Sequence, residues 1–198
     1  MLENTYFYII NLERRTDRKE FCKKWLINYP NLSATFYKGI DGWQTDLRKG
    51  NLTSGMVACF QTHRSLWQHI LDNHKNQRYI CIMEDDIFPT TDFHNKLASL
   101  EIPDNVDMLN FDWVAKRNAI IYPMNKDFLF VKNSWINLSF YAVKVDSIPQ
   151  LLKCTENIDL QLDMQLSIEQ IKDNINIGFS KIQLSRQNKK LGSDVQIH

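Results

Sequence analysis

The sequence predicts an α/β fold with a mainly parallel central sheet. Short apolar runs rich in β-forming residues alternate with segments whose apolar residues recur at helical spacing, as in strands joined by crossover helices. The 198 residues are 43% hydrophobic, which is enough for one sizeable core. Because no internal repeat and no Gly/Pro-rich linker divides the chain, we expect a single domain over residues 1–198.

The first predicted unit is a strand over residues 6–10, followed by a polar turn and a helix that ends before Pro30. Arg14, Arg15 and Arg18 fall in or next to the turn. Their guanidinium groups have the geometry to bind a phosphate or a base. A solvated basic face at a helix start is the simpler interpretation of each arginine taken alone.

A second short strand is predicted over residues 34–37, and a long helix is predicted to start near Gly55. Thr53 or Ser54 would cap the helix, because a side-chain oxygen there can accept a free backbone N–H. His63 lies on the apolar stripe of this helix. We favour a hydrogen-bonded core histidine at this position over a catalytic one.

The most informative stretch is a predicted buried strand over residues 79–83 that ends in three carboxylates, Glu84, Asp85 and Asp86. Ionised carboxylates cannot remain unpaired inside a sheet, and ligands of α/β sheets bind at the carboxyl ends of strands. Strand alternation predicts that Glu84 and Asp86 share one side and that Asp85 lies opposite. Two such oxygen ligands suit Mg²⁺ or Mn²⁺. Pro89 is expected to prevent any continuation of the strand. An acidic turn that only ends the strand is the alternative to a metal site.

The rest of the chain is expected to continue the alternation of strands and helices. The predicted strands cover residues 106–111, 136–145, 175–177 and 182–184, the helices cover 92–100, 146–152 and a segment ending at 171, residues 116–132 form a loop with a hairpin, and residues 187–198 form a polar tail.

Composition excludes several classes of protein. The net charge of +1, without a dense Lys/Arg block, gives no basic surface for nucleic acid. No apolar segment is long enough to span a bilayer, and the opening residues do not resemble a secretory signal. The four cysteines are scattered without metal-binding spacing, as expected of reduced core residues. These observations lead us to expect a cytoplasmic protein.

Six short motifs occur in one order along nearly the whole chain: YIINLERRTDR at 8–18, GIDG at 39–42, GMVACFQTHRSLW at 55–67, MEDD at 83–86, VDML at 106–109 and GSDV at 192–195. In type, order and spacing they resemble glycosyltransferase family 25, the lipooligosaccharide and collagen galactosyltransferase group. Two departures from the family pattern are conservative: Ala58 replaces a glycine and Thr62 replaces a serine. The chain is also shorter than expected for the family after Asp112.

The resemblance implies a GT-A-type fold, in which one Rossmann-like domain binds a nucleotide sugar, usually UDP-galactose, with Mn²⁺. Residues 1–112 would form the nucleotide-sugar-binding half, and residues 113–198 the acceptor side and a C-terminal lid. The acceptor would be a lipooligosaccharide, another glycan or a hydroxylysine-type group. The lack of a signal-like opening favours a bacterial or viral enzyme acting in the cytoplasm or at the inner face of the membrane.

The resemblance also implies roles for individual residues. The metal would be held by Glu84 and Asp86. The residues expected to bind the donor substrate are Asn11, Leu12, Arg15, Arg18, Asp41, Gly42, Asp85, Ser193 and Asp194.

The family is expected to invert the anomeric carbon, which requires one general base on the acceptor hydroxyl. Asp163, ahead of a late predicted helix, fits this role, and Asp159 is its competitor; for either residue, capping the helix is the common alternative. The resemblance also makes a site role for His63, in positioning, as plausible as a core role.

Two other functions remain open from the sequence. A metal-dependent phosphohydrolase or nuclease could use the acidic triplet, but it would normally require more carboxylates or histidines around two metals. A sugar-nucleotide-binding protein without turnover is compatible with the shortened acceptor region.

Overall fold

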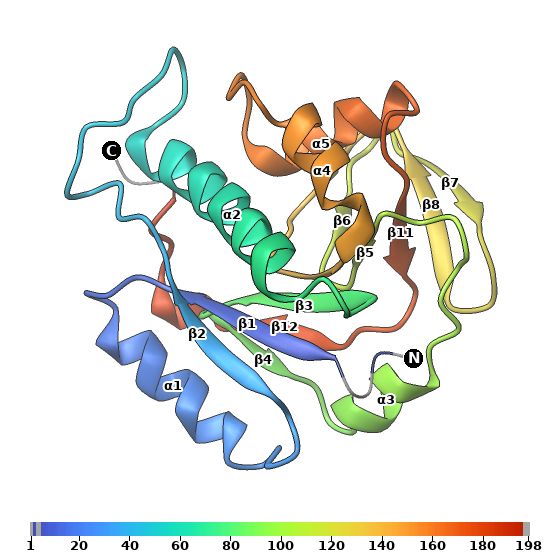
Figure 1. Cartoon of the computed structure of the whole chain (residues 1–198), viewed down its shortest axis with the longest axis horizontal. Helices are drawn as coiled ribbons and strands as arrows, with labels where there is room; N and C mark the ends of the chain where they lie inside the picture. The colour runs from blue at the N-terminus through green and yellow to red at the C-terminus, as the bar shows by residue number, and fades with distance from the viewer. Residues whose placement is uncertain (1, 3–4, 196–198) are drawn as a thin grey trace.

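A mixed sheet forms the centre of the fold in the computed structural model, which describes residue 2 and residues 5–195; Met1, Glu3, Asn4 and residues 196–198 lie outside the described part. The strands of this sheet are β1 (Tyr6–Asn11), β2 (Ala34–Lys38), β3 (Tyr79–Glu84), β5 (Met108–Asn110), β7 (Ile120–Pro123), β8 (Phe128–Lys132), β10 (Phe140–Lys144) and β11 (Ile177–Ser180). Over the described residues their order is β2-β1-β3-β10-β5-β11-β8-β7 (Figure 1).

The predicted mainly parallel α/β arrangement is confirmed. Strand β1 runs parallel to β2 and β3, and β5 runs parallel to β11. Strands β10 and β8 are antiparallel to each of their neighbours. Of the eight strands found in the described residues, β2, β1, β3, β5, β11 and β7 therefore point one way, while β10 and β8 point the other way. Strands from both sides of residue 112 join this one sheet.

Helices cover both faces of the sheet (Figure 1). Their bounds are α1 (Thr16–Leu26), α2 (Ser54–Asn73), α3 (Phe93–Ser99), α4 (Ile148–Cys154) and α5 (Leu162–Ile171). Within the described residues, no helix combines the length and apolar character needed to cross a bilayer.

Strand alternation divides the core between the two faces. On β3, Ile80 and Ile82 pack in one cluster with side chains of α2, α4 and α5, whereas Cys81 and Met83 pack in a second cluster with side chains of α1 and α3. Burial of each large apolar side chain contributes about 1.5–3 kcal/mol. This two-sided burial explains why β3 is continuously apolar up to Glu84.

Several boundaries differ from the sequence-based expectations. The strands predicted at 106–111 and 136–145 are shorter, as β5 and β10, and those predicted at 175–177 and 182–184 lie later, as β11 and β12 (Ser185–Gln187). Pro89 does not prevent a strand: β4 (Ile87–Pro89) follows the acidic triplet and pairs with β12. Pro89 is tolerated because it ends the strand of a two-stranded sheet, where its missing N–H leaves no gap in a ladder.

The chain after β12 is folded, in contrast to the polar tail expected from composition. A 3₁₀ turn, η2 (Lys189–Leu191), leads into residues 192–195, which we call the C-terminal strap. The strap lies against the start of α2, so closely that a Cβ atom on Gly55 would be 2.6 Å from the backbone oxygen of Asp194. Only glycine at position 55 permits this approach, and the tail prediction is therefore wrong for residues 187–195.

Thr53 links the start of α2 to the strap. Its Oγ1 accepts a hydrogen bond from the backbone N–H of Met56 at 3.2 Å, which confirms Thr53 rather than Ser54 as the helix cap. The same hydroxyl donates to the backbone oxygen of Val195 at 2.9 Å. One hydroxyl group thus satisfies an unpaired helix N–H and also holds the strap.

Thr53→Ala should lower the stability of the protein, because it removes both hydrogen bonds. Loss of an N-cap costs about 1 kcal/mol of the free energy of unfolding. For a chain of this length, that loss lowers Tm by about 2–4 °C. Thermal unfolding followed by circular dichroism measures the effect, and Thr53→Ser, which keeps the hydroxyl, should unfold near the wild-type temperature. Equal Tm values for wild type and Thr53→Ala would contradict the proposed role of the cap.

Candidate active site

A cavity of about 110 Å³ lies where the parallel strands β2, β1 and β3 end. Parallel strands bring their carboxyl ends to the same edge of the sheet. Residues that follow β1 and β2 therefore meet the acidic triplet at the end of β3. The predicted site residues that line the cavity are Leu12, Arg18, Asp41, Gly42, His63, Glu84, Asp85, Asp86, Ser193 and Asp194.

The three carboxylates of the triplet all border this cavity, including Asp85, which alternation predicted on the side opposite Glu84 and Asp86. The reason is that β3 ends at Glu84 and the chain turns at Asp85 and Asp86. Asp85 is 3% exposed, and its Oδ1 accepts from Arg18 Nη1 at 2.7 Å. Its Oδ2 accepts from Asn11 Nδ2 at 2.6 Å, so protein donors engage both oxygens.

Asp86 is buried but less completely paired. Its Oδ2 accepts from Gln187 Nε2 at 2.9 Å, while its Oδ1 is buried and has no hydrogen-bond partner among the described residues. Burial and the nearby charge of Glu84 raise the pKa of Asp86 to about 7. A buried oxygen without a partner, beside a second carboxylate, is suited to a cation. Glu84 and Asp86 therefore fit the predicted metal site.

The position of His63 is compatible with both of the roles that the sequence left open. Its side chain is 2% exposed, and its Nδ1 lies 2.8 Å from the hydroxyl of Tyr141, as expected of a hydrogen-bonded core histidine. Its Nε2 lies 3.6 Å from Oε1 of Glu84, on the wall of the cavity. The position of His63 on the apolar face of α2 thus buries the side chain and also places its Nε2 next to Glu84 of the acidic triplet.

The arginine turn and the C-terminal strap are joined by ion pairs to Asp194. Arg14 Nη2 lies 2.6 Å from Asp194 Oδ1, Arg18 Nη2 lies 3.2 Å from Oδ2, and Arg15 Nη1 also pairs with Oδ2. Arg14 Nε in addition lies 2.8 Å from Asp41 Oδ2. The guanidinium groups predicted to meet a phosphate are therefore occupied by a carboxylate of the same chain.

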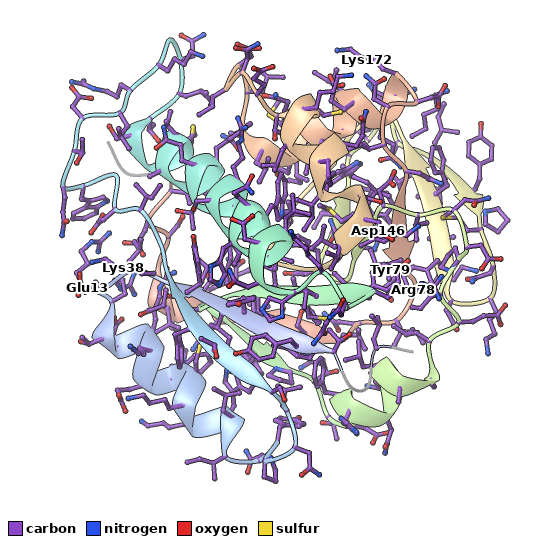
Figure 2. All side chains as sticks on the ribbon, viewed as in Figure 1. Glu13, Lys38, Arg78, Tyr79, Asp146 and Lys172 are labelled. Carbon is purple, nitrogen blue, oxygen red and sulfur yellow. The ribbon has the colours of Figure 1, made fainter. Side chains whose placement is uncertain are left out.

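Figure 2 labels residues at the two ends of the parallel strands β1, β2 and β3. The labelled pair Glu13 and Lys38, which forms an ion pair, lies beside the arginine turn. Arg78 and Tyr79, at the start of β3, lie at the opposite side of the molecule. The cavity is thus at the carboxyl end of β3, as predicted.

The two candidate bases do not line the cavity. Asp163, in the first turn of α5, accepts backbone N–H groups of Asn137 at 3.0 Å and Met164 at 2.8 Å. Asp163 is not the N-cap of α5, which is Gln161; its bond to Asn137 instead joins the first turn of the helix to the segment before β10. The side chain of Asp159 is 73% exposed and lies 4.0 Å from Lys49, so the structure leaves it outside the site. A catalytic role for Asp163 stays a prediction.

Sequence reasoning missed three side chains at or near the cavity. Cys59 lines it one helical turn before His63, and this spacing of four residues was a usable signal. Gln187 reaches Asp86 only because β12 pairs with β4, which no local pattern predicts. Asp112 accepts from Ser139 Oγ at 2.6 Å, and burial raises its pKa, with the charge of Glu84 adding to the shift.

Asp86 should make the protein less stable as the pH rises toward neutrality. Its pKa in the folded chain, about 7, is above the unfolded value, so the folded form retains a proton that the unfolded form has already lost. The free energy of unfolding therefore falls between the two pKa values, by roughly 1–2 kcal/mol from about pH 5.5 to about pH 7.5.

Asp86→Asn cannot ionise and should lose this part of the pH dependence. Urea unfolding of both proteins across this pH range, with EDTA present, measures the difference. Parallel stability curves for wild type and Asp86→Asn would show that the pKa of Asp86 is not raised.

Comparison with known proteins assigns the chain to a family. The family model described as glycosyltransferase family 25 (LPS biosynthesis protein) matches residues 4–166. Human procollagen galactosyltransferase 2 is 26% identical over 123 residues, which are 54% of this chain and 19% of that protein. Putative glycosyltransferase R655 of Acanthamoeba polyphaga mimivirus is 28% identical over 112 residues, 50% of this chain and 34% of that protein. The chain thus spans a fifth to a third of the length of these relatives.

A solved structure shares the fold. The crystal structure of A197 from STIV superposes with a TM-score of 0.50 at 12% identity, covering 89% of this chain and 81% of that one. The conserved sheet therefore extends well beyond the part matched to the curated relatives. Since the family model covers well over half of the sequence, the chain belongs to glycosyltransferase family 25, and its sheet is the expected mainly parallel α/β sheet.

Proposed function

We propose that this chain transfers a hexose, most favourably galactose, from a UDP-sugar to a hydroxyl group of a glycan or hydroxylysine-type acceptor. The reaction depends on a divalent cation and inverts the anomeric carbon. Galactose is favoured because a human relative is named a procollagen galactosyltransferase. The observation that carries the proposal is the buried Oδ1 of Asp86 beside Glu84, which has no hydrogen-bond partner in the described part of the chain and lies in a cavity that Arg18 also lines.

Glu84 and Asp86 would hold Mn²⁺ or Mg²⁺, because carboxylate oxygens are the ligands that these hard cations prefer. When bound, the cation stabilises the negative charge that develops on the diphosphate leaving group. Asp85 has a different task. Its two carboxylate oxygens accept hydrogen bonds from Arg18 and Asn11, and these bonds would fix the turn from which Glu84 and Asp86 face the cavity.

Arg14, Arg15 and Arg18 would bind the donor diphosphate after the strap carboxylate of Asp194 leaves them. Guanidinium groups suit this exchange, since they bind carboxylate and phosphate oxygens with the same planar geometry. Leu12, Asp41 and Gly42 line the cavity close to this turn and would contact the rest of the nucleotide. Ser193 and Asp194 would then close over the donor as the lid.

The acceptor hydroxyl requires a base on the side opposite the leaving group, and we assign this role to Asp163. Burial raises the pKa of the Cys59 thiol, and the charges of Glu84 and Asp163 add to this shift, which supports a position of Asp163 near the cavity although it does not line it. His63 would orient Glu84 from the neighbouring helix. A hydrolase using two metals is less well supported, because the family model that matches residues 4–166 describes glycosyltransferases.

Asp86→Ala should abolish metal-dependent UDP binding. Wild type should bind UDP with Mn²⁺ present and lose most of this affinity in EDTA, and the variant should bind at least about tenfold more weakly because it lacks a metal ligand. Isothermal titration calorimetry measures both effects. Asp72→Ala, at an exposed carboxylate on α2, is the matched control and should bind as wild type does.

Undiminished UDP binding in EDTA, or no binding in Mn²⁺, would contradict the transferase proposal. Release of UDP from UDP-galactose only when a glycan acceptor is added would exclude a protein that binds donors without turnover. Release of phosphate from simple phosphate esters would instead support the hydrolase.

Asp163→Asn should lower kcat by about 10²–10⁴-fold, the usual contribution of a general base, while leaving UDP affinity unchanged. Asp159→Asn tests its competitor and should keep kcat, because Asp159 is at the surface. Steady-state galactosyl transfer with a hydroxylated acceptor measures both variants. A large loss in Asp159→Asn with none in Asp163→Asn would reverse the assignment.

A further inference from the structure

A second group of potential ligand atoms lies on the wall of the same cavity. Cys59 and His63 project from successive turns of α2, and Glu84 faces them from the end of β3. The Cys59 thiol, a ring nitrogen of His63 and a carboxylate oxygen of Glu84 all lie within 4.8 Å of one another. We propose that these three side chains bind a thiophilic divalent cation of the Zn²⁺ type, at a site distinct from the cation expected at Asp86.

The imidazole of His63 is already oriented for such a site. Its Nδ1 is 2.8 Å from the hydroxyl of Tyr141, which in turn accepts from Nε1 of Trp67 at 2.9 Å. A metal-binding histidine usually has its second nitrogen fixed by a partner of this kind. The remaining nitrogen, Nε2, is 3.6 Å from Oε1 of Glu84. Two ligands of a tetrahedral zinc ion are about 3.4 Å apart, so the two groups need little movement.

The donor atoms determine which cation is favoured. One thiolate, one imidazole and one carboxylate form a set that zinc proteins use, whereas Mg²⁺ and Mn²⁺ prefer oxygen ligands alone. All three side chains line the cavity. Three protein ligands leave the fourth tetrahedral position open on the cavity side, where water or a bound molecule can complete the coordination.

Glu84 would belong to both cation sites, and this consequence rests on the proposed function. A carboxylate drawn toward Cys59 and His63 is withdrawn from the cation at Asp86. Zn²⁺ should therefore weaken the Mn²⁺-dependent binding of UDP. The ligand that distinguishes the two sites is Cys59, because a thiol contributes to the zinc site alone.

Titration with Co²⁺, a spectroscopic substitute for Zn²⁺, tests the site directly in the full chain kept reduced. Wild type should develop a thiolate-to-cobalt charge-transfer band that saturates at one cation per chain, and Zn²⁺ should then remove it. Cys59→Ser should lack the band. Cys154→Ser, at a half-buried cysteine of α4 away from the cavity, is the matched control and should keep it.

His63→Gln and Glu84→Gln retain the thiol and test the other two ligands. Each should weaken Co²⁺ binding by at least about tenfold. Far-UV circular dichroism verifies that each variant is folded, and these two variants decide the question if Cys59→Ser does not fold. No band in wild type, a band that persists in Cys59→Ser, or full Co²⁺ affinity in both His63→Gln and Glu84→Gln would overturn the proposal.

Asp86→Ala separates this inference from the proposed function. It should lose Mn²⁺-dependent UDP binding but keep the cobalt band, since Asp86 is not a ligand of the thiolate site. Loss of the band in folded Asp86→Ala would show a single shared cation site and overturn the inference. A cobalt band in a wild-type protein that does not bind UDP would refute the proposed function and support the zinc-type site.

Discussion

The buried ion pair between Arg18 and Asp85 is the interaction on which the site depends. Both side chains are almost fully removed from water, with residue exposures of 6% and 3%. Such burial is tolerated because Asn11 binds the second carboxylate oxygen and the Gly192 carbonyl accepts from the guanidinium. Removing one partner of a pair of this kind costs about 3–5 kcal/mol, because the other charge is left buried alone.

This pair also explains how distant parts of the sequence come together. It connects helix α1, the turn after β3 and the C-terminal strap. Arg18 is 67 residues before Asp85 and 174 residues before Gly192 in the sequence. Each segment alone is polar and would remain in water. Together they satisfy one another, and the neighbouring Asp86 is left with the buried oxygen that suits a cation.

The sequence predicted those parts of the fold that depend on local patterns. The apolar run of β3 and the stripe and cap of α2 follow from periodicity and hydrogen-bonding chemistry, and both lie where expected. The site residues that line the cavity were found mainly through ordered motifs. Periodicity could not reveal the turn that brings Asp85 to the same cavity as Glu84, because alternation holds only while the strand continues.

Long-range contacts set the limit of that reasoning. Gln187 meets Asp86 across 101 residues because β12 pairs with β4, and Asp194 meets Arg14 across 180 residues. Hydropathy assigns such polar segments to solvent, because it contains no information about the ionic partners that they meet in the folded chain. The same limit applies to Asp163, whose bond to the backbone of Asn137 no local pattern predicts.

The strap also affects how readily the cavity accepts a ligand. The volume of the cavity, about 110 Å³, is below the roughly 300–1,000 Å³ of most small-molecule sites. Asp194 belongs to the same chain as the arginines it pairs with, so it would compete with an incoming anion as an intramolecular ligand, at an effective concentration that dilution does not change. An anion's measured affinity is its intrinsic affinity reduced by the fraction of molecules in which the strap is open. Under the proposed function, the C-terminal strap would therefore set the lowest donor concentration at which the arginines are occupied.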